Sequence, residues 1–400
     1  MASSNRVAVV GYAQSPVARH AEMTLGALAV DTARRGRRGR RPDGERCGRL
    51  RDGQPVPFRR RHAAVDGVSL VSANWLAEHL GVNPRYAAGF QGFGQLPGAV
   101  ALAVNAVVSG AADYVLLHCA LHNPRGKHDA NPMTDVRGAQ QWTVPQGYFR
   151  PLAMIALAYT EYLERYDATR EAMAAVVVEA RKNGARIPWS YWYDTTLRAE
   201  EYLSEPMVND PICRLDCDIP VDAVACFVLT SAERARDLPH RPVCVAGYAT
   251  GAPVKHRLPL HWLLDDVMAV GEETARRLWQ RSGVGLTEVD LPQVYDGFSP
   301  IVYLWMSRCP CGPSGRRTAW HSEAASTATV ATRCRCSRVE GRSGTDACTA
   351  SHSCSSATWS WPVGRGGGSV RTCPSAWRVI PLRIMEAQWS TAPSRSEVPT

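Results

Sequence analysis

The chain has 400 residues, 45% of them hydrophobic, and a formal net charge of +9. This length is enough for one large or two medium domains with a sizeable core. No apolar run reaches the roughly 20 residues that a membrane span needs, and the N-terminus lacks the basic and apolar regions of a secretory signal. We therefore expect a cytoplasmic protein that does not cross a membrane.

One short segment supplies the excess charge. Residues 34–61 contain twelve Arg against Asp43, Glu45 and Asp52, and the remainder of the chain is balanced. A basic arm of this kind could bind nucleic acid or another anionic surface. The arginines are not interleaved with aromatic residues and no nucleic-acid module is recognisable, so we expect no nucleic-acid partner.

A change of reading frame accounts for this segment and for the Arg-, Ser-, Cys- and Trp-rich tail after about residue 306. Neither stretch has helix or strand periodicity. A GC-rich gene read out of register turns Ala, Asp and Glu codons into Arg and Gly codons. For residues 34–61 one shift permits AAADAGLTESDVDGFATGSLFPS, and for residues 332–364 the opposite shift permits a string containing GRMHG. We expect both segments to be out of frame and this polypeptide to be inactive.

Cysteine usage favours reduced thiols. Seven of the thirteen Cys lie at or beyond Cys309, inside the aberrant tail. Cys309-Pro-Cys311 and Cys334-Arg-Cys336 are spaced more closely than the usual zinc ligands, and no flanking His pair is present. We expect no metal and no bound cofactor.

The rest of the chain has the pattern of an α/β protein. Residues 97–109 are small and apolar on nearly every side, which is typical of a helix buried between layers. Residues 121–211, polar and rich in Trp and Tyr, are expected to form an insertion or cap. We expect other helices at residues 24–33, 68–80, 153–166, 170–183, 231–238 and 264–282, and strands at residues 7–11, 113–119, 221–230, 242–248 and 289–295.

Three ordered motifs resemble the thiolase superfamily: SGAADYVLL, DCDIPVDAVACFVLTSAERARDL followed by RPVCVAGY, and VDLPQVYDGFSPIVY. They resemble the lipid-transfer-protein or sterol-carrier-protein-X type, which includes steroid side-chain aldolases. The resemblance covers residues 5–33 and 62–306. It implies a five-layer αβαβα fold of two similar halves. The N-terminal half would span residues 1–240, and residues 241–306 would begin a C-terminal half that this reading frame leaves incomplete.

The superfamily implies acyl-CoA substrates, and its classical members use a Cys at the N-terminus of the buried helix, where the helix end lowers the thiol pKa. Here that segment contains Gly92, Phe93 and Gly94 without a nearby Cys, Ser or Thr. Cys-dependent thiolysis is therefore not expected. The segment could let the backbone approach a thioester or the CoA arm, or it could be a plain Gly-rich turn.

Tyr295 is the catalytic candidate, because it precedes a sharp turn at Asp296 and Gly297 and because the resemblance implies that a Tyr in this motif handles protons. Retro-aldol cleavage of a β-hydroxyacyl-CoA needs a base for the hydroxyl proton and stabilisation of the thioester enolate, but no covalent nucleophile. A buried Tyr that bonds backbone is the alternative.

Two histidines, His118 and His122, flank the strand end that borders the active site in this family. Either could contact the substrate or CoA, and either could instead be structural. The aromatic residues 189–193 could line a lipid channel or pack a loop. The resemblance also implies a homodimer and a small OB-fold partner protein.

Three functions remain open at this stage. The first is carbon–carbon cleavage by retro-aldol chemistry, or acyl transfer, on a lipid or sterol side-chain CoA thioester. The second is CoA or lipid binding without chemistry, as in lipid transfer. The third, nucleic-acid binding, depends wholly on the Arg-rich segment.

Overall fold

The computed structural model describes residues 6–38, 68, 70–90, 95–122, 136–148, 151–238, 242–251, 263–284 and 295–306. The predicted frame-shifted segments lie outside these ranges beyond residue 38 and after residue 306. The predicted strand at residues 289–295 also lies outside them, except for Tyr295.

A four-stranded antiparallel sheet, in the order β2-β5-β1-β6, underlies the N-terminal part of the molecule. Its strands are β1 (Val7–Gln14), β2 (Tyr114–Leu121), β5 (Ala223–Ser231) and β6 (Val243–Cys244). β5 has a neighbour on each side and is buried at all but two of its nine positions. This burial on both faces explains why its sequence is a continuous apolar run rather than an alternation.

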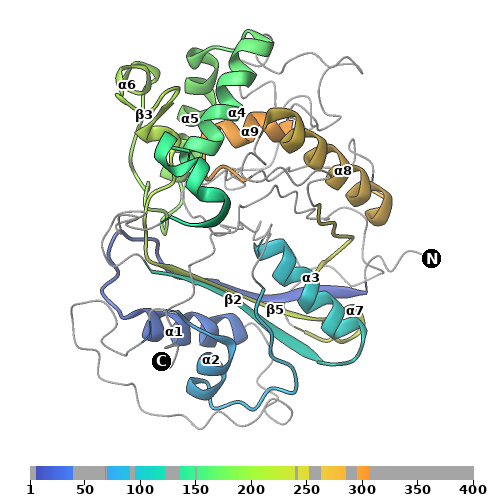
Figure 1. Cartoon of the computed structure of the whole chain (residues 1–400). Helices are drawn as coiled ribbons and strands as arrows, with labels where there is room; N and C mark the ends of the chain where they lie inside the picture. The colour runs from blue at the N-terminus through green and yellow to red at the C-terminus, as the bar shows by residue number, and fades with distance from the viewer. Residues whose placement is uncertain are drawn as a thin grey trace, which may run out of the picture.

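Helices cover both faces of the sheet. α1 (Leu25–Arg38) and α2 (Ala73–His79) pack on one face, and α3 (Gln95–Val108) packs on the other (Figure 1). Successive side chains of β5 point to opposite faces, so Cys226 joins the α1 side and Phe227 the α3 side. The predicted sheet and its covering helices are therefore confirmed as an α/β arrangement.

The apolar character of α3 corresponds to burial, as predicted. Among its described side chains only Asn105 and Val108 are exposed. α3 lies between the sheet and a further group of helices (Figure 1). Gly110, with a φ of 75°, follows the helix and leads the chain back into β2.

Helix α1 runs five residues into the segment for which we expected no helix, and that expectation is wrong for residues 34–38. Arg is a good helix former, and a small residue is needed where the helix meets the sheet. A Cβ atom at Gly11 of β1 would overlap the carbonyl oxygen of Gly36 in α1. The helix backbone therefore rests directly on the strand backbone.

Apart from α7 (Ala232–Ala235), which contacts β1 and β5, the remaining α-helices and strands form a second layer beyond α3 (Figure 1). They are α4 (Pro151–Tyr166), α5 (Arg170–Ala185), α6 (Ala199–Ser204), β3 (Met207–Asn209), β4 (Ile212–Cys213), α8 (Leu264–Ser282) and α9 (Ser299–Met306). One apolar core joins them, with Tyr159, Tyr162 and Tyr303 buried among aliphatic side chains. The predicted cap helices thus pack against α8 and α9.

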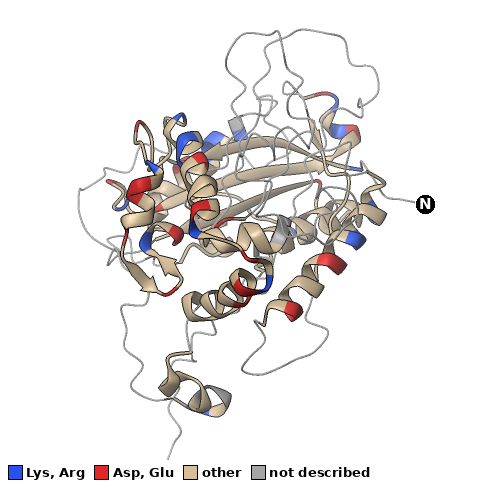
Figure 2. Ribbon diagram, turned by 90° about the horizontal axis from the view of Figure 1, so that it is seen from above, with Lys and Arg blue, Asp and Glu red and all other residues tan. Residues whose placement is uncertain are grey.

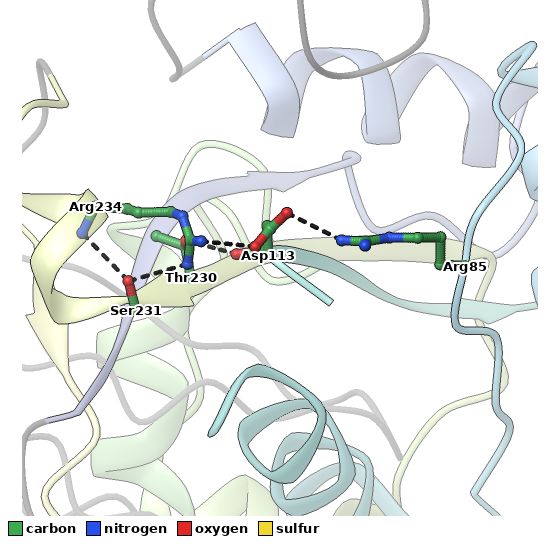
Figure 3. Close-up of polar contacts among 5 residues, drawn as sticks. All are labelled: Arg85, Asp113, Thr230, Ser231 and Arg234. Carbon is green, nitrogen blue, oxygen red and sulfur yellow. Dashed lines mark hydrogen bonds and ion pairs between the residues drawn. The ribbon is translucent and has the colours of Figure 1, made fainter. Parts of the chain in front are cut away.

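Charged residues of both signs are interspersed on the described helices (Figure 2). At one end of β5, Asp113 accepts hydrogen bonds from Arg85 at 3.0 Å and Arg234 at 2.6 Å (Figure 3). The backbone oxygen of Asp113 accepts a third bond, from the Thr230 hydroxyl at 2.7 Å. All three charged side chains are about half exposed or more, so each ion pair contributes at most about 1 kcal/mol.

A buried carboxylate connects α6 and β4 of the cap by hydrogen bonds. Asp216, only 1% exposed, accepts hydrogen bonds from the Tyr202 hydroxyl at 2.8 Å and from the Cys213 backbone N–H at 2.9 Å. Burial, with the nearby carboxylate of Asp216, raises the pKa of Tyr202 well above its usual value. The phenol therefore keeps its proton and remains a donor at every physiological pH.

We expect Tyr202→Phe to lower the free energy of unfolding by about 1–3 kcal/mol, because Asp216 loses a donor that water cannot replace at this buried position. Tyr193→Phe is the control: the side chain is 52% exposed, and its change should stay within about 0.5 kcal/mol. Urea unfolding curves of the two variants measure the difference. Equal stabilities would show that the buried hydrogen bond contributes nothing.

Candidate functional site

The turn after Tyr295 folds the phenol back over the chain. A Cβ atom at Gly297 would overlap the hydroxyl oxygen and ring carbons of Tyr295, so a residue with a side chain does not fit there. Tyr295 is half buried and packs against the apolar core of the cap helices. The structure therefore places the catalytic candidate at the junction between a tight turn and the cap.

Backbone contacts join this turn to the segment that leads into β5. The Asp218 N–H donates to the Gly297 carbonyl at 2.9 Å, and Cys217 forms an antiparallel bridge with Phe298. Four residues after Asp218 the chain reaches Asp222. Four residues span at most about 14 Å, which limits the distance between the Tyr295 turn and Asp222.

Asp222 holds the second candidate, His122. The Nδ1 atom of His122 lies 2.8 Å from Asp222 Oδ1, and the two side chains are 13% and 8% exposed. The other carboxylate oxygen, Oδ2, accepts the Ala21 N–H at 2.9 Å. Backbone hydrogen bonds in both directions between Ala18 and Asp222 fix the carboxylate further.

This pairing determines which nitrogen of His122 is available. A carboxylate accepts but does not donate, so Nδ1 carries the proton in the hydrogen bond and the lone pair of the neutral ring is on Nε2. Nε2 is buried and has no hydrogen-bond partner among the described residues. A buried imidazole held by a carboxylate, with a free acceptor nitrogen, is the arrangement of a general base.

His118 is bound differently. Its Nε2 atom lies 3.0 Å from the backbone oxygen of Val71, which joins β2 to the segment before α2. Burial lowers the pKa of His118, and the hydrogen bond to Val71 opposes this only in part. His118 and His122 therefore lie near the same strand end but have separate partners, and contact of His118 with a ligand stays a prediction.

Two further predictions concern the Gly-rich segment and the aromatic segment. Gly92, Phe93 and Gly94 lie outside the described residues. In the aromatic segment at residues 189–193, Trp189, Tyr191 and Tyr193 are exposed, and the Trp189 carbonyl accepts the Val17 N–H at 2.9 Å. The segment thus lies next to the loop that carries Ala18 and Ala21.

Comparison with known proteins adds to this geometry. No protein-family model matches the chain. A 17-hydroxy-3-oxo-4-pregnene-20-carboxyl-CoA lyase of Mycobacterium tuberculosis is 30% identical over 212 residues, covering 50% of this chain and 55% of the lyase. The chain spans about half the length of the curated relatives it matches.

Solved structures share the fold. An Ltp2-ChsH2(DUF35) aldolase aligns with a TM-score of 0.62 and 21% identity, covering 77% of this chain and 78% of that one. A monomeric SCP2-thiolase-like protein type 1 from Mycobacterium smegmatis aligns with a TM-score of 0.54 and 19% identity, covering 76% and 63%. The structural likeness confirms the predicted thiolase-like fold, and the sequence similarity supports the resemblance to SCP2-like steroid aldolases that the motifs indicated.

Three of the five described thiols of this thiolase-like chain are poor nucleophiles. Burial raises the pKa of Cys213 to about 11, and burial with Asp216 and Asp218 raises that of Cys217 to about 12. Burial also raises the pKa of Cys226, to about 12. Since the thiolate is the reactive form, these residues are inert at neutral pH.

Sequence reasoning missed Asp222, although a signal was present: it is the acidic residue at the head of an otherwise apolar strand. Within the described ranges no three His, Cys, Asp or Glu side chains gather as metal ligands do. None of the described helices combines the length and apolarity required to cross a bilayer.

The lowered pKa of His118 predicts a pH dependence of stability. The folded state binds the His118 proton less readily than the unfolded chain does, so the unfolded chain takes up more protons below the usual value of 6.5. The contribution to stability is complete above that pH and is lost as the pH falls below it. His118→Gln should flatten this loss while keeping a donor for the Val71 carbonyl.

Urea unfolding at a series of pH values on both sides of 6.5 measures the effect. His79→Gln is the matched control, since His79 is exposed on α2. An unchanged acid limb in His118→Gln would contradict the assignment.

Proposed function

We propose that this thiolase-like chain is a carbon–carbon lyase. It would cleave a β-hydroxyacyl-CoA by retro-aldol chemistry, with a steroid or another bulky lipid as the acyl group. The observation that carries the proposal is the segment at residues 217–222, which contacts the Tyr295 turn at one end and holds His122 at the other. Two proton-transfer groups are thereby tied to one short stretch of backbone.

The chemistry requires no covalent intermediate. His122 Nε2 takes the proton of the substrate hydroxyl, and the oxygen electrons form a carbonyl as the bond between the α and β carbons breaks. The electrons of that bond pass into the thioester as an enolate. The Tyr295 hydroxyl hydrogen-bonds to the enolate and donates its proton to the α carbon. Return of the proton from the imidazolium to the phenolate restores the site.

Three observations support this class of reaction over thiolysis. Burial raises the pKa of three of the five described thiols, Cys213, Cys217 and Cys226, and so disfavours their thiolate forms. A relative is named as a lyase of a hydroxylated steroid carboxyl-CoA, and a structural neighbour is named as an aldolase. That neighbour's title pairs it with a DUF35 protein, so we also propose that this chain works with a small partner protein, besides forming a homodimer.

Tyr295→Phe and His122→Gln test the two roles. In a protein with residues 34–61 and 307–400 restored to frame, we expect each change to lower the cleavage rate of a β-hydroxyacyl-CoA by about 10²–10⁴-fold, the usual contribution of a positioned acid or base. His79→Gln, a change at an exposed residue of α2, is the control. Full activity in Tyr295→Phe would remove the phenol from the mechanism.

We expect the unaltered polypeptide to show no turnover, because a tail out of frame would lack the sequence that closes the fold. Resequencing of the gene across both segments decides the frame directly. Measurable turnover by the unaltered chain would contradict this prediction. Binding of CoA by the restored protein without any cleavage would favour the alternative, a thiolase-fold protein of lipid transfer.

A further inference from the structure

A buried cation that has no counter-ion among the described residues lies in the cap. Arg181 of α5 is only 5% exposed. Its guanidinium carbon lies 3.2 Å from the centre of the Trp192 ring, so the indole covers one face of the cation. Among the residues that the structure describes, no carboxylate pairs with Arg181.

Arg181 and Trp192 each have a buried hydrogen-bond donor without an acceptor among the described residues. Arg181 Nε and Trp192 Nε1 are buried, and neither has a hydrogen-bond partner in the described part of the chain. Guanidinium and indole nitrogens only donate. A buried donor without a partner costs about 1–3 kcal/mol, and more for a charged group. The missing partner must therefore be an acceptor, and the uncompensated positive charge favours an anion.

The surrounding loop holds the pair rigidly. Gly184, one turn along α5, allows the loop to approach, since a Cβ there would lie 3.3 Å from Trp192 Cβ. The backbone N–H of Trp192 donates to the Ser190 hydroxyl at 3.0 Å, and the Thr195 hydroxyl donates to the Trp192 carbonyl at 2.6 Å. The Asp194 N–H donates to the Ala185 carbonyl at 3.0 Å. The ring thus keeps its position over the cation without a ligand.

Burial lowers the pKa of Arg181 to about 10, because desolvation disfavours the charged form of the side chain. The guanidinium nevertheless stays charged at neutral pH, which lies well below that value. An anion brought to this site would offset the lost hydration of the cation, and planar guanidinium groups are well suited to bind carboxylate and phosphate.

We propose that Arg181 and Trp192 form a binding site for an oxyanion, the carboxylate or phosphate group of a ligand. The guanidinium supplies the charge and the indole N–H supplies a second donor beside it. The site uses neither Tyr295 nor His122. It lies on the loop whose Trp189 carbonyl bonds to Val17, close in sequence to Ala18 and Ala21, the partners of Asp222.

The test measures thermal unfolding of the full chain in potassium phosphate, in potassium acetate and in potassium chloride of equal ionic strength. We expect saturable stabilisation by phosphate or acetate beyond that given by chloride. Arg181→Met should weaken the apparent affinity at least about tenfold, the loss of one charged hydrogen bond. Lys182→Met, a neighbouring exposed cation on the same helix, should leave it unchanged.

A second variant keeps the test decisive if Arg181→Met fails to fold. Trp192→Phe retains an aromatic ring over the cation and removes only the N–H, so it should weaken oxyanion binding while preserving the fold. A stronger response to phosphate identifies a phosphate-bearing ligand, and a stronger response to acetate a carboxylate. A response equal to that of chloride, or one that neither variant alters, would overturn the proposal and leave a purely structural stack.

Discussion

The position of β5 inside the sheet is the constraint on which most of this molecule depends. β5 pairs with β1 on one side and with β2 on the other. It therefore brings together strands that are far apart in the sequence. Its two buried faces hold α1 and α3 in place. The residues at the two ends of β5 are therefore positioned by the whole sheet rather than by local sequence.

Similar chemistry occurs at both ends of β5, with different consequences. At one end Asp113 pairs with Arg85 and Arg234 in solvent, where water and salt screen the charges. At the other end Asp222 pairs with His122 under cover of the β1–α1 loop. Removal from water strengthens the hydrogen bond and orients the imidazole. Burial, and not the type of residue, is what distinguishes a candidate catalytic pair from a surface ion pair.

Local patterns predicted most of the fold. The bounds of α8 were predicted correctly, since its apolar stripe is regular and Gly283, with a φ of 63°, ends it. β6 was expected to be longer than the two residues observed, because apolar residues alone do not supply a pairing partner. The histidines were found by their place in a motif, whereas the contact of His122 with Asp222 spans 100 residues and depends on strand register. The Arg181 stack likewise depends on loop geometry, which periodicity does not encode.

The close approach of α1 and β1 has a consequence for the two reading frames. A methyl group at position 36 would meet Ala13 and Cys226 at 3.6 Å, an ordinary contact distance. The shifted frame permits Ala at this position, and Ala in a helix interior is more favourable than Gly by about 1 kcal/mol. The helix–strand contact is therefore compatible with Gly or Ala at position 36, and the sheet core accepts either residue there without rearrangement.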